Sequence, residues 1–270
     1  MSTRRAAYEA RQRRRANLLA GISTAVVLLL LVLLVPLAPG WAAVKASFFD
    51  GTIFLRTFPD LANAFLINIA IFAWSVPLIA ALGLAIALAR GARAPVLFPL
   101  RIFGAIYVDL FRGIPVVLLV YLVGFGIPGL GLPRPWNSPY IWGTVALVLT
   151  YSAYVAEVLR SGIESIHASQ RNAAICLGLN ERDTMRYVIL PQAIRRVVPA
   201  NMNMLVALQK DVALLSFIGP VEILRQAGIF KSLLANFTPY VAAAVIFLCV
   251  TVPATRYADH LMNRDRDART

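Results

Sequence analysis

Long apolar runs, separated by short polar and charged stretches, fill the chain from residue 18 onward. Six runs reach the roughly 20 residues that a helix needs to cross the hydrocarbon core of a membrane. They lie near residues 18–38, 62–89, 99–125, 141–159, 198–220 and 239–258. The pattern predicts an all-α polytopic membrane protein with about six transmembrane helices, the second of them kinked at Pro77.

Composition agrees with a membrane protein, because 59% of the residues are hydrophobic and only 14% are charged. The net charge of +13 does not indicate nucleic-acid binding, since the basic residues are divided among the gaps between apolar runs. With the N-terminus in the cytoplasm, 19 of the 26 lysines and arginines fall in cytoplasmic stretches and five in external loops. We therefore expect a multi-pass protein of a bacterial plasma (inner) membrane, with both termini cytoplasmic.

The two ends of the chain are expected to be cytoplasmic tails, at residues 1–17 and 259–270. The arginines within 4–15 are expected to hold the first tail inside and to contact anionic membrane lipid. The run at 18–38 has two interpretations, an additional N-terminal transmembrane helix that is retained or a signal peptide that is cleaved. Its length exceeds the roughly 7–15 residues of a signal-peptide core, which favours the retained helix.

A charged stretch, residues 160–196, stands between the fourth and fifth apolar runs. It holds nine of the chain's 39 charged residues, so we expect it in cytoplasmic water rather than in lipid. Ser169 is suited to cap a helix over Gln170–Leu177, and Gly178 to adopt the left-handed conformation that ends it.

A second helix is predicted directly afterwards, over Glu181–Leu190. Asn180 is suited to cap this helix, and Pro191 is expected to limit its length. The stretch is thus predicted to be a compact helix–turn–helix with a small apolar face for docking another protein, or else a solvated loop without a partner. The residues of that face, at helical spacing on the first helix, are Ala173, Cys176 and Leu177.

Residues 171–191, RNAAICLGLNERDTMRYVILP, resemble the cytoplasmic coupling loop of permease subunits of ABC importers, whose pattern is E-A-A-x3-G-x9-I-x-L-P. The spacing is kept throughout. Two positions depart from the pattern, because Asn172 replaces the usual Glu and Val188 the usual Ile. Asparagine removes a charge, which puts an ionic contact of residue 172 with the ATPase in doubt. The matching coupling residues are Asn172, Ala173, Ala174, Gly178, Leu190 and Pro191.

Three further stretches, 109–132, 151–170 and 190–219, look like the polar amino acid branch of that family. The resemblance implies a five-helix permease core over residues 62–258, with the coupling loop at 160–196 and one extra N-terminal helix. It also implies a dimer with a second permease subunit, identical or related. Each coupling loop would bind a subunit of an ATPase dimer, whose closure would move the permeases between inward-facing and outward-facing states.

The sequence adds two observations about partners. No phosphate-binding loop is present, because no lysine follows a glycine as that motif requires. We therefore expect no enzymatic activity and no cofactor in this chain, with ATP and Mg bound by the ATPase partner. The external segments are too short for a receptor domain, which implies a separate extracytoplasmic amino-acid-binding protein. The three lysines and the residues before them are Val44–Lys45, Gln209–Lys210 and Phe230–Lys231.

Charged residues within the apolar runs are candidates for the substrate path, since such residues are costly there and often functional. One interpretation is a site for a zwitterionic amino acid, in which Arg112 holds the carboxylate and Asp109 or Glu157 the ammonium. The other is mutual neutralisation of Asp109 with Arg112, of Glu157 with Arg160, and of Lys210 with Asp211 or with a carboxylate on another helix. Five amides are weaker candidates, expected to form interhelical hydrogen bonds, namely Asn63, Asn68, Asn201, Asn203 and Gln209. The candidate path residues are Asp109, Arg112, Glu157, Lys210 and Asp211.

Other functional classes have less support in the sequence. An ABC permease for another small polar solute would share the coupling loop but not the stretches FRGIP and AEVLRSGI. A secondary transporter or channel is indicated by neither an internal repeat nor a filter-like segment. An intramembrane enzyme or a metal site is not indicated, because His167 and His260 lie outside the spans and Cys176 and Cys249 have no ligand spacing.

Overall fold

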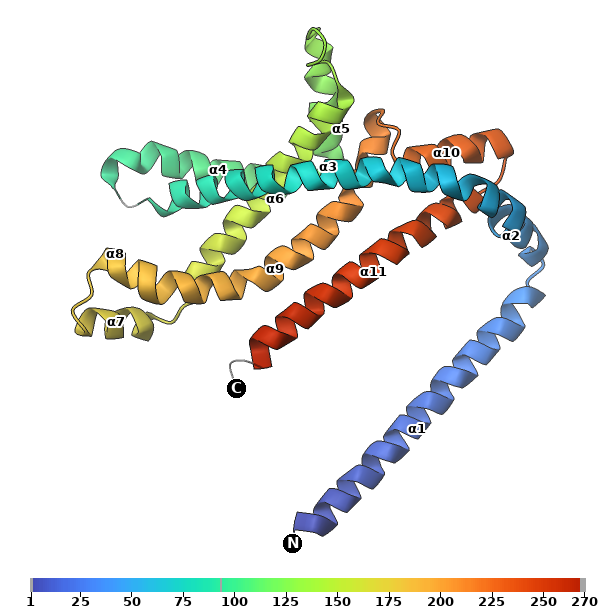
Figure 1. Cartoon of the computed structure of the whole chain (residues 1–270), viewed down its shortest axis with the longest axis horizontal. Helices are drawn as coiled ribbons and strands as arrows, with labels where there is room; N and C mark the ends of the chain where they lie inside the picture. Colours follow the sequence, from blue (N-terminus) through green and yellow to red (C-terminus); the bar gives the residue numbers. More distant parts are fainter. Residues whose placement is uncertain (1, 93, 268–270) are drawn as a thin grey trace.

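In the computed structural model, which describes residues 2–92 and 94–267, every regular element is a helix (Figure 1). Shorter 3₁₀ and π segments join or extend several of the α-helices. The α-helices are α1 (Ser2–Leu34), α2 (Trp41–Phe48), α3 (Gly51–Gly91), α4 (Phe98–Gly113), α5 (Val116–Gly126), α6 (Pro139–Glu164), α7 (Ala168–Cys176), α8 (Glu181–Asp183), α9 (Leu190–Asp211), α10 (Ile223–Leu234) and α11 (Thr238–Asp267).

The described residues contain four helices that are long and apolar enough to cross a membrane, and up to six spans if two bent helix pairs are each one span. All six predicted runs fall within these helices to within two residues at their ends. The prediction of an all-α polytopic membrane protein is therefore confirmed. The four helices are Gln12–Leu37, Trp41–Gly91, Pro139–Glu164 and Thr238–His260, and the bent pairs are Pro95–Gly113 with Val116–Leu130 and Glu181–Ile218 with Ile223–Leu234.

The third run, predicted as one helix over 99–125, is broken in the middle. α4 and α5 are bent by 106° relative to one another. Pro115 has no N–H to donate and disfavours the helical conformation of the residue before it, and Ile114 accordingly has a ψ of 131°. The FRGIP sequence therefore ends one helix beside Arg112 and starts another in a new direction.

The second helix of the loop, predicted over Glu181–Leu190, is longer than predicted, because Pro191 does not end it. α8 continues through a π-helical segment, η4 (Thr184–Ile189), into α9. The i→i+5 bonding of a π turn frees the carbonyl that an α-helix would pair with residue 191, so the missing N–H of proline is tolerated. The resulting rod, Glu181–Asp211, joins the charged loop directly to the apolar fifth run.

The bundle is built around α6, which packs against α3, α4, α5 and α9. Small residues allow these helices to approach closely. A Cβ on Gly162 of α6 would lie 2.1 Å from Val197 Cγ1 of α9, and a Cβ on Gly83 of α3 would lie 2.7 Å from Val155 Cγ1 of α6. The position of α6 is therefore fixed by glycines at its contacts with both α3 and α9.

Two of the five amides, Asn68 and Gln209, join helices as expected, whereas the buried Oδ1 of Asn201 has no hydrogen-bond partner among the described residues. Asn68 of α3 donates to Glu222 Oε2 at 2.9 Å and accepts from the backbone N–H of Ile223 at 3.1 Å. Gln209 of α9 accepts from the hydroxyl of Thr251 in α11 at 2.9 Å. The first of these contacts also fixes the start of α10, because Glu222 caps that helix by accepting from the backbone of Arg225 at 2.8 Å.

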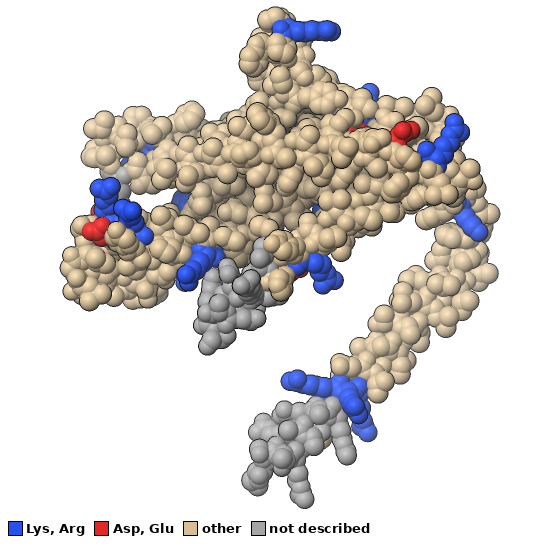
Figure 2. Space-filling model, viewed as in Figure 1, with Lys and Arg blue, Asp and Glu red and all other residues tan. Residues whose placement is uncertain are grey.

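The surface of the bundle is mostly uncharged between its two ends. In Figure 2, blue lysine and arginine side chains lie near α7 and α8 at one end and near α2 and α10 at the other, with others on α1, at the tip above α5 and along the lower edge. α1 lies apart from the bundle, and its membrane-spanning part has no buried residue (Figure 1). These exposed apolar surfaces suit contact with lipid or with other membrane helices.

Candidate coupling loop and transport path

The first helix of the charged loop at residues 160–196, α7, begins two residues earlier than predicted. His167 is its cap, because Nδ1 of His167 accepts from the backbone N–H of Ser169 at 3.2 Å. Ser169 is not the cap, since its hydroxyl pairs with the same ring nitrogen at 2.8 Å. The prediction for the end of the helix is confirmed, because Gly178 has a φ of +83° and starts the turn.

The second cap is also confirmed, since Asn180 Oδ1 accepts from the backbone N–H of Asp183 at 2.9 Å. Beneath the two helices lies a small apolar core of Ile166, Ile189 and Ala193. Arg196 of α9 donates to the carbonyl oxygen of Ser165 at 2.6 Å and so joins α9 to the end of α6. The loop is therefore a packed unit fixed to both α6 and α9.

The exposed face of α7 is small and apolar, as predicted, with Leu177 82% exposed. Ala174 does not belong to this face, because it is buried within the loop. Its carbonyl oxygen accepts from the backbone N–H of Leu179 at 3.1 Å, so its neighbourhood supports the turn. The predicted coupling residues that are exposed are Asn172, Ala173, Gly178, Leu190 and Pro191.

A cleft of about 330 Å³ separates α7 from the segment formed by α8 and η4. It combines charged and apolar side chains, and one of its residues, Thr184, is buried with an unpartnered hydroxyl. The lining residues are Arg171, Ile175, Glu181, Arg182, Thr184, Met185 and Ile189.

Among the charged residues of the spans, Glu157 is the centre of a cluster. It accepts from Arg90 at 2.6 Å and from Arg160 at 2.5 Å, and Arg112 lies 3.8 Å away. Arg160 also pairs with Glu164. The predicted pairing of Glu157 with Arg160 is confirmed, but Glu157 is too heavily paired with arginines to be a ready ammonium acceptor.

Arg112 does not pair with Asp109 as the neutralisation scheme predicted. Its guanidinium lies beside Glu157 and over the ring of Tyr154, with 5.6 Å between the guanidinium carbon and the ring centroid. Asp109 is exposed, and the described residues show no ion pair for it. The break at Pro115 explains the difference, since Arg112 at the very end of α4 can turn towards α6.

Asp211 is likewise engaged across helices, because it accepts a hydrogen bond from the hydroxyl of Tyr151 at 2.8 Å. No ion pair joins it to Lys210 in the described part of the chain, so that predicted pair is absent. Lys210 is exposed instead, in a groove of about 810 Å³ between α9 and α11.

A polar stripe on α6 connects these groups. Tyr151, Tyr154 and Glu157 are three residues apart and thus share one side of the helix. Arg112 lies at the Tyr154–Glu157 end and Asp211 at the Tyr151 end. The sequence reasoning missed the tyrosines and Arg90, although the i, i+3, i+6 spacing within a span could have revealed the stripe.

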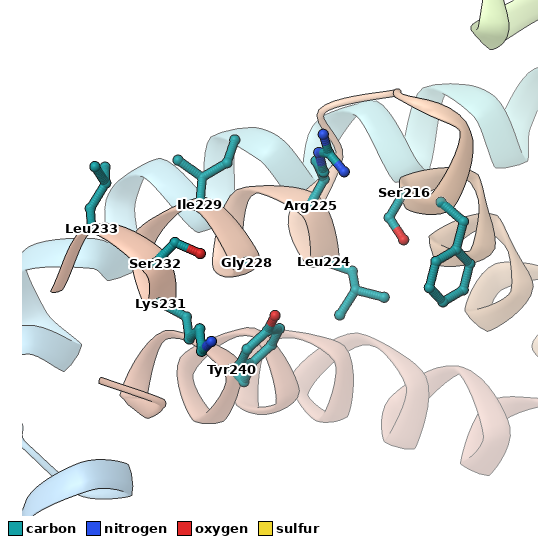
Figure 3. A pocket seen from close by; sticks show the side chains of 10 residues that line it. Ser216, Leu224, Arg225, Gly228, Ile229, Lys231, Ser232, Leu233 and Tyr240 are labelled. Carbon is teal, nitrogen blue, oxygen red and sulfur yellow. The ribbon is translucent and has the colours of Figure 1, made fainter. Parts of the chain in front are cut away.

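The opposite end of the molecule from the loop carries a further groove, of about 720 Å³, between α10 and α11 (Figures 1 and 3). Arg225 and Lys231 give it positive charge. Tyr240 of α11 points towards α10 in Figure 3, and a Cβ on Gly228 would lie 3.2 Å from its hydroxyl. A cationic, partly aromatic groove of this size suits an acidic protein segment.

Known proteins resemble this chain over most of its length. The chain is 34% identical over 184 residues to a Bacillus subtilis protein named "Probable glutamine ABC transporter permease protein GlnM", covering 68% of this chain and 82% of the relative. It is 30% identical over 206 residues to "Probable amino-acid permease protein YxeN" of the same organism, covering 75% and 90%.

A solved structure shares both fold and sequence with the chain. It is described as "Crystal structure of an amino acid ABC transporter with histidines", with a TM-score of 0.73 and 29% identity over 80% of this chain and 98% of that one. Residues 81–266, which include the charged loop, the α6 stripe, α9, α10 and nearly all of α11, match one family model. The chain belongs to the family described as the binding-protein-dependent transport system inner membrane component.

Proposed function

We propose that the chain is the permease subunit of an ATP-driven importer of polar amino acids. The observation that carries the proposal is the cytoplasmic loop, which packs as one unit on the ends of α6 and α9 and exposes a short apolar helix, α7. Such a unit transmits force from an outside partner to the membrane helices. The energy comes from a separate ATPase dimer, which binds ATP and Mg.

In this coupling, α7 lies in a groove of the ATPase. Ala173 allows close approach, and Asn172 contacts the partner without a charge. Gly178 sets the turn between α7 and the long helix, while Ala174 keeps α7 packed on the loop. Leu190 and Pro191 lie at the junction of η4 and α9, where motion of the loop enters the rod.

The α6 stripe is the proposed substrate path. Arg112 holds the carboxylate of the amino acid. Asp211, rather than Asp109 or Glu157, attracts its ammonium group. The stripe supports this choice because it places a half-exposed guanidinium near one end and a carboxylate near the other. Glu157 positions Arg112. The exposed side chains of Asp109 and Lys210 contact water or the second permease subunit.

The topology follows from charge. With the arginine-rich loop and both termini in the cytoplasm, the α10–α11 groove of Figure 3 faces the extracytoplasmic side. There its cations meet the separate amino-acid-binding protein that delivers substrate. The basic N-terminal tail contacts anionic lipid at the cytoplasmic surface.

The experiment is a mild-detergent purification of the tagged chain followed by reconstitution with whatever subunits accompany it. We expect an ATPase subunit with a phosphate-binding loop to co-purify. We also expect proteoliposomes that contain ATP to take up glutamine or arginine when the binding protein is added outside. Gly178→Asp is expected to abolish uptake while leaving the chain folded. A chain that is folded but has no ATPase partner would contradict the proposal.

A further inference from the structure

The cleft between α7 and α8–η4 has a cationic rim and apolar walls. Arg171 and Arg182 supply the charge, and no ion pair of either is found in the part of the chain that the structure describes. Glu181, the acidic residue of the cleft, is already engaged in an interaction of its own. Because Arg182 is exposed and Arg171 half-buried, the rim attracts a negative group from outside the chain.

Thr184 gives the cleft a second polar group that lacks a partner, in addition to the two arginines. The residue is 2% exposed, and its Oγ1 has no hydrogen-bond partner. Its backbone N–H is satisfied, since it donates to the carbonyl oxygen of Asn180 at 2.9 Å. An unpartnered buried hydroxyl is unfavourable, so an acceptor placed in the cleft would be stabilised by it.

The sequence of α7 explains why a negative group is expected here. The coupling pattern usually has Glu at the position of Asn172, but this exposed residue is neutral. The cleft behind α7 instead presents arginines. An ionic contact with the partner therefore requires an acid on the partner's side.

We propose that the cleft receives one aspartate or glutamate side chain of the ATPase subunit. Its carboxylate forms ion pairs with Arg171 and Arg182 and accepts a hydrogen bond from the hydroxyl of Thr184. Ile175 and Met185 pack against the methylene groups of the inserted side chain. The inference rests on the proposed docking of the loop and adds the chemistry of one contact. In this contact the permease supplies the cations and the ATPase the carboxylate, whereas the usual coupling pattern has a Glu on the permease.

The test uses the full-length chain and the ATPase subunit that co-purifies with it, and measures their dissociation constant at several salt concentrations. Arg182→Gln is expected to weaken binding at least tenfold and to reduce its salt dependence. Arg186→Gln is the matched control, because Arg186 is also an exposed cation of the loop but stacks on Tyr187 and does not line the cleft. Its binding should stay within twofold of the wild type.

Thr184→Val separates docking from folding. Removing an unsatisfied hydroxyl should raise the unfolding temperature of the isolated chain, yet weaken ATPase binding at least threefold if an inserted carboxylate uses that hydroxyl. A lysine substitution of one acidic ATPase residue that restores binding to Arg182→Glu would identify the inserted side chain.

The outcomes distinguish the inference from the proposed function. If the wild type binds the ATPase and both cleft variants bind equally well, the inference is overturned and the docking function stands. If free glutamate stabilises the chain in an Arg182-dependent way while ATPase binding is unchanged, the cleft takes a small carboxylate and the docked acid is likewise rejected. If the wild type binds no ATPase, both proposals fail.

Discussion

Arg90 at the end of α3 donates a hydrogen bond to Glu157 in α6 over 2.6 Å, although 67 residues separate them in sequence. This contact and the neighbouring Arg112 and Arg160 make Glu157 the single carboxylate shared by three helices. The side chain of Glu157 is 19% exposed, so the arginines are only partly screened from one another. The cluster therefore joins the C-terminal parts of α3, α4 and α6.

Replacing Glu157 by Gln should destabilise the chain by about 2 kcal/mol, because the arginines would repel one another without their shared carboxylate. The measurement is thermal unfolding of the purified chain in detergent. Glu164→Gln is the control, since Glu164 is 61% exposed and pairs only with Arg160, and it should cost under about 0.5 kcal/mol. Equal losses in the two variants would show that the cluster has no special role.

Gly178→Ala should cost about 1 kcal/mol, because φ of +83° is unfavourable for a residue with a Cβ. No atom lies within 4 Å of the added Cβ, so the cost arises from the backbone and not from a clash. We expect reduced uptake per ATP hydrolysed in the reconstituted complex. Gly91→Ala, at an equally open helical position, should leave uptake unchanged.

Gly162→Ala should separate α6 from α9, since the new methyl group would lie 2.1 Å from Val197 Cγ1. Overpacking of this kind typically costs about 1–3 kcal/mol. The second change Val197→Ala makes room for the methyl group, so the double variant should recover most of the loss. A double-mutant cycle of unfolding free energies checks this, and simple additivity of the two losses would contradict the described contact.

Asn68→Leu should destabilise the start of α10 by about 3 kcal/mol, because Glu222 is completely buried and would lose the only side-chain donor that it has among the described residues. Hydrogen exchange of α10 should rise more than that of α6. Adding Glu222→Leu should restore part of the stability, as it removes the buried carboxylate. No recovery in the double variant would mean that Asn68 acts mainly through the backbone of Ile223.

The helices were predictable from sequence because lipid imposes a simple length and polarity rule on every span. The turn at Gly178 and the cap at Asn180 were predictable because each depends on local backbone chemistry. The positions where helices break were harder to predict from the sequence. Pro115 bends its run by 106° while Pro191 is absorbed by a π turn, and both sequences show only a proline in a polar–apolar junction.

The site was predicted in part. The Glu157–Arg160 pair follows from i, i+3 spacing on one helix, whereas the same spacing wrongly predicted a pair of Asp109 with Arg112, which turns to Glu157 instead. The contacts of Arg90 with Glu157 and of Tyr151 with Asp211 join distant segments and depend on how the helices pack. A single sequence contains no direct measure of that packing, and for the same reason the inward position of Ala174 was not foreseen.

The continuous helical rod from Glu181 to Asp211 connects the charged loop stiffly to the fifth span, so that the two move together. Its 31 residues span about 45 Å at 1.5 Å per residue. If its membrane end were the pivot, a tilt of about 10° would displace its cytoplasmic end by about 8 Å for a rod of this length. A movement of a few ångströms at α7 would thus become a small angular change beside Tyr151, without any helix having to melt.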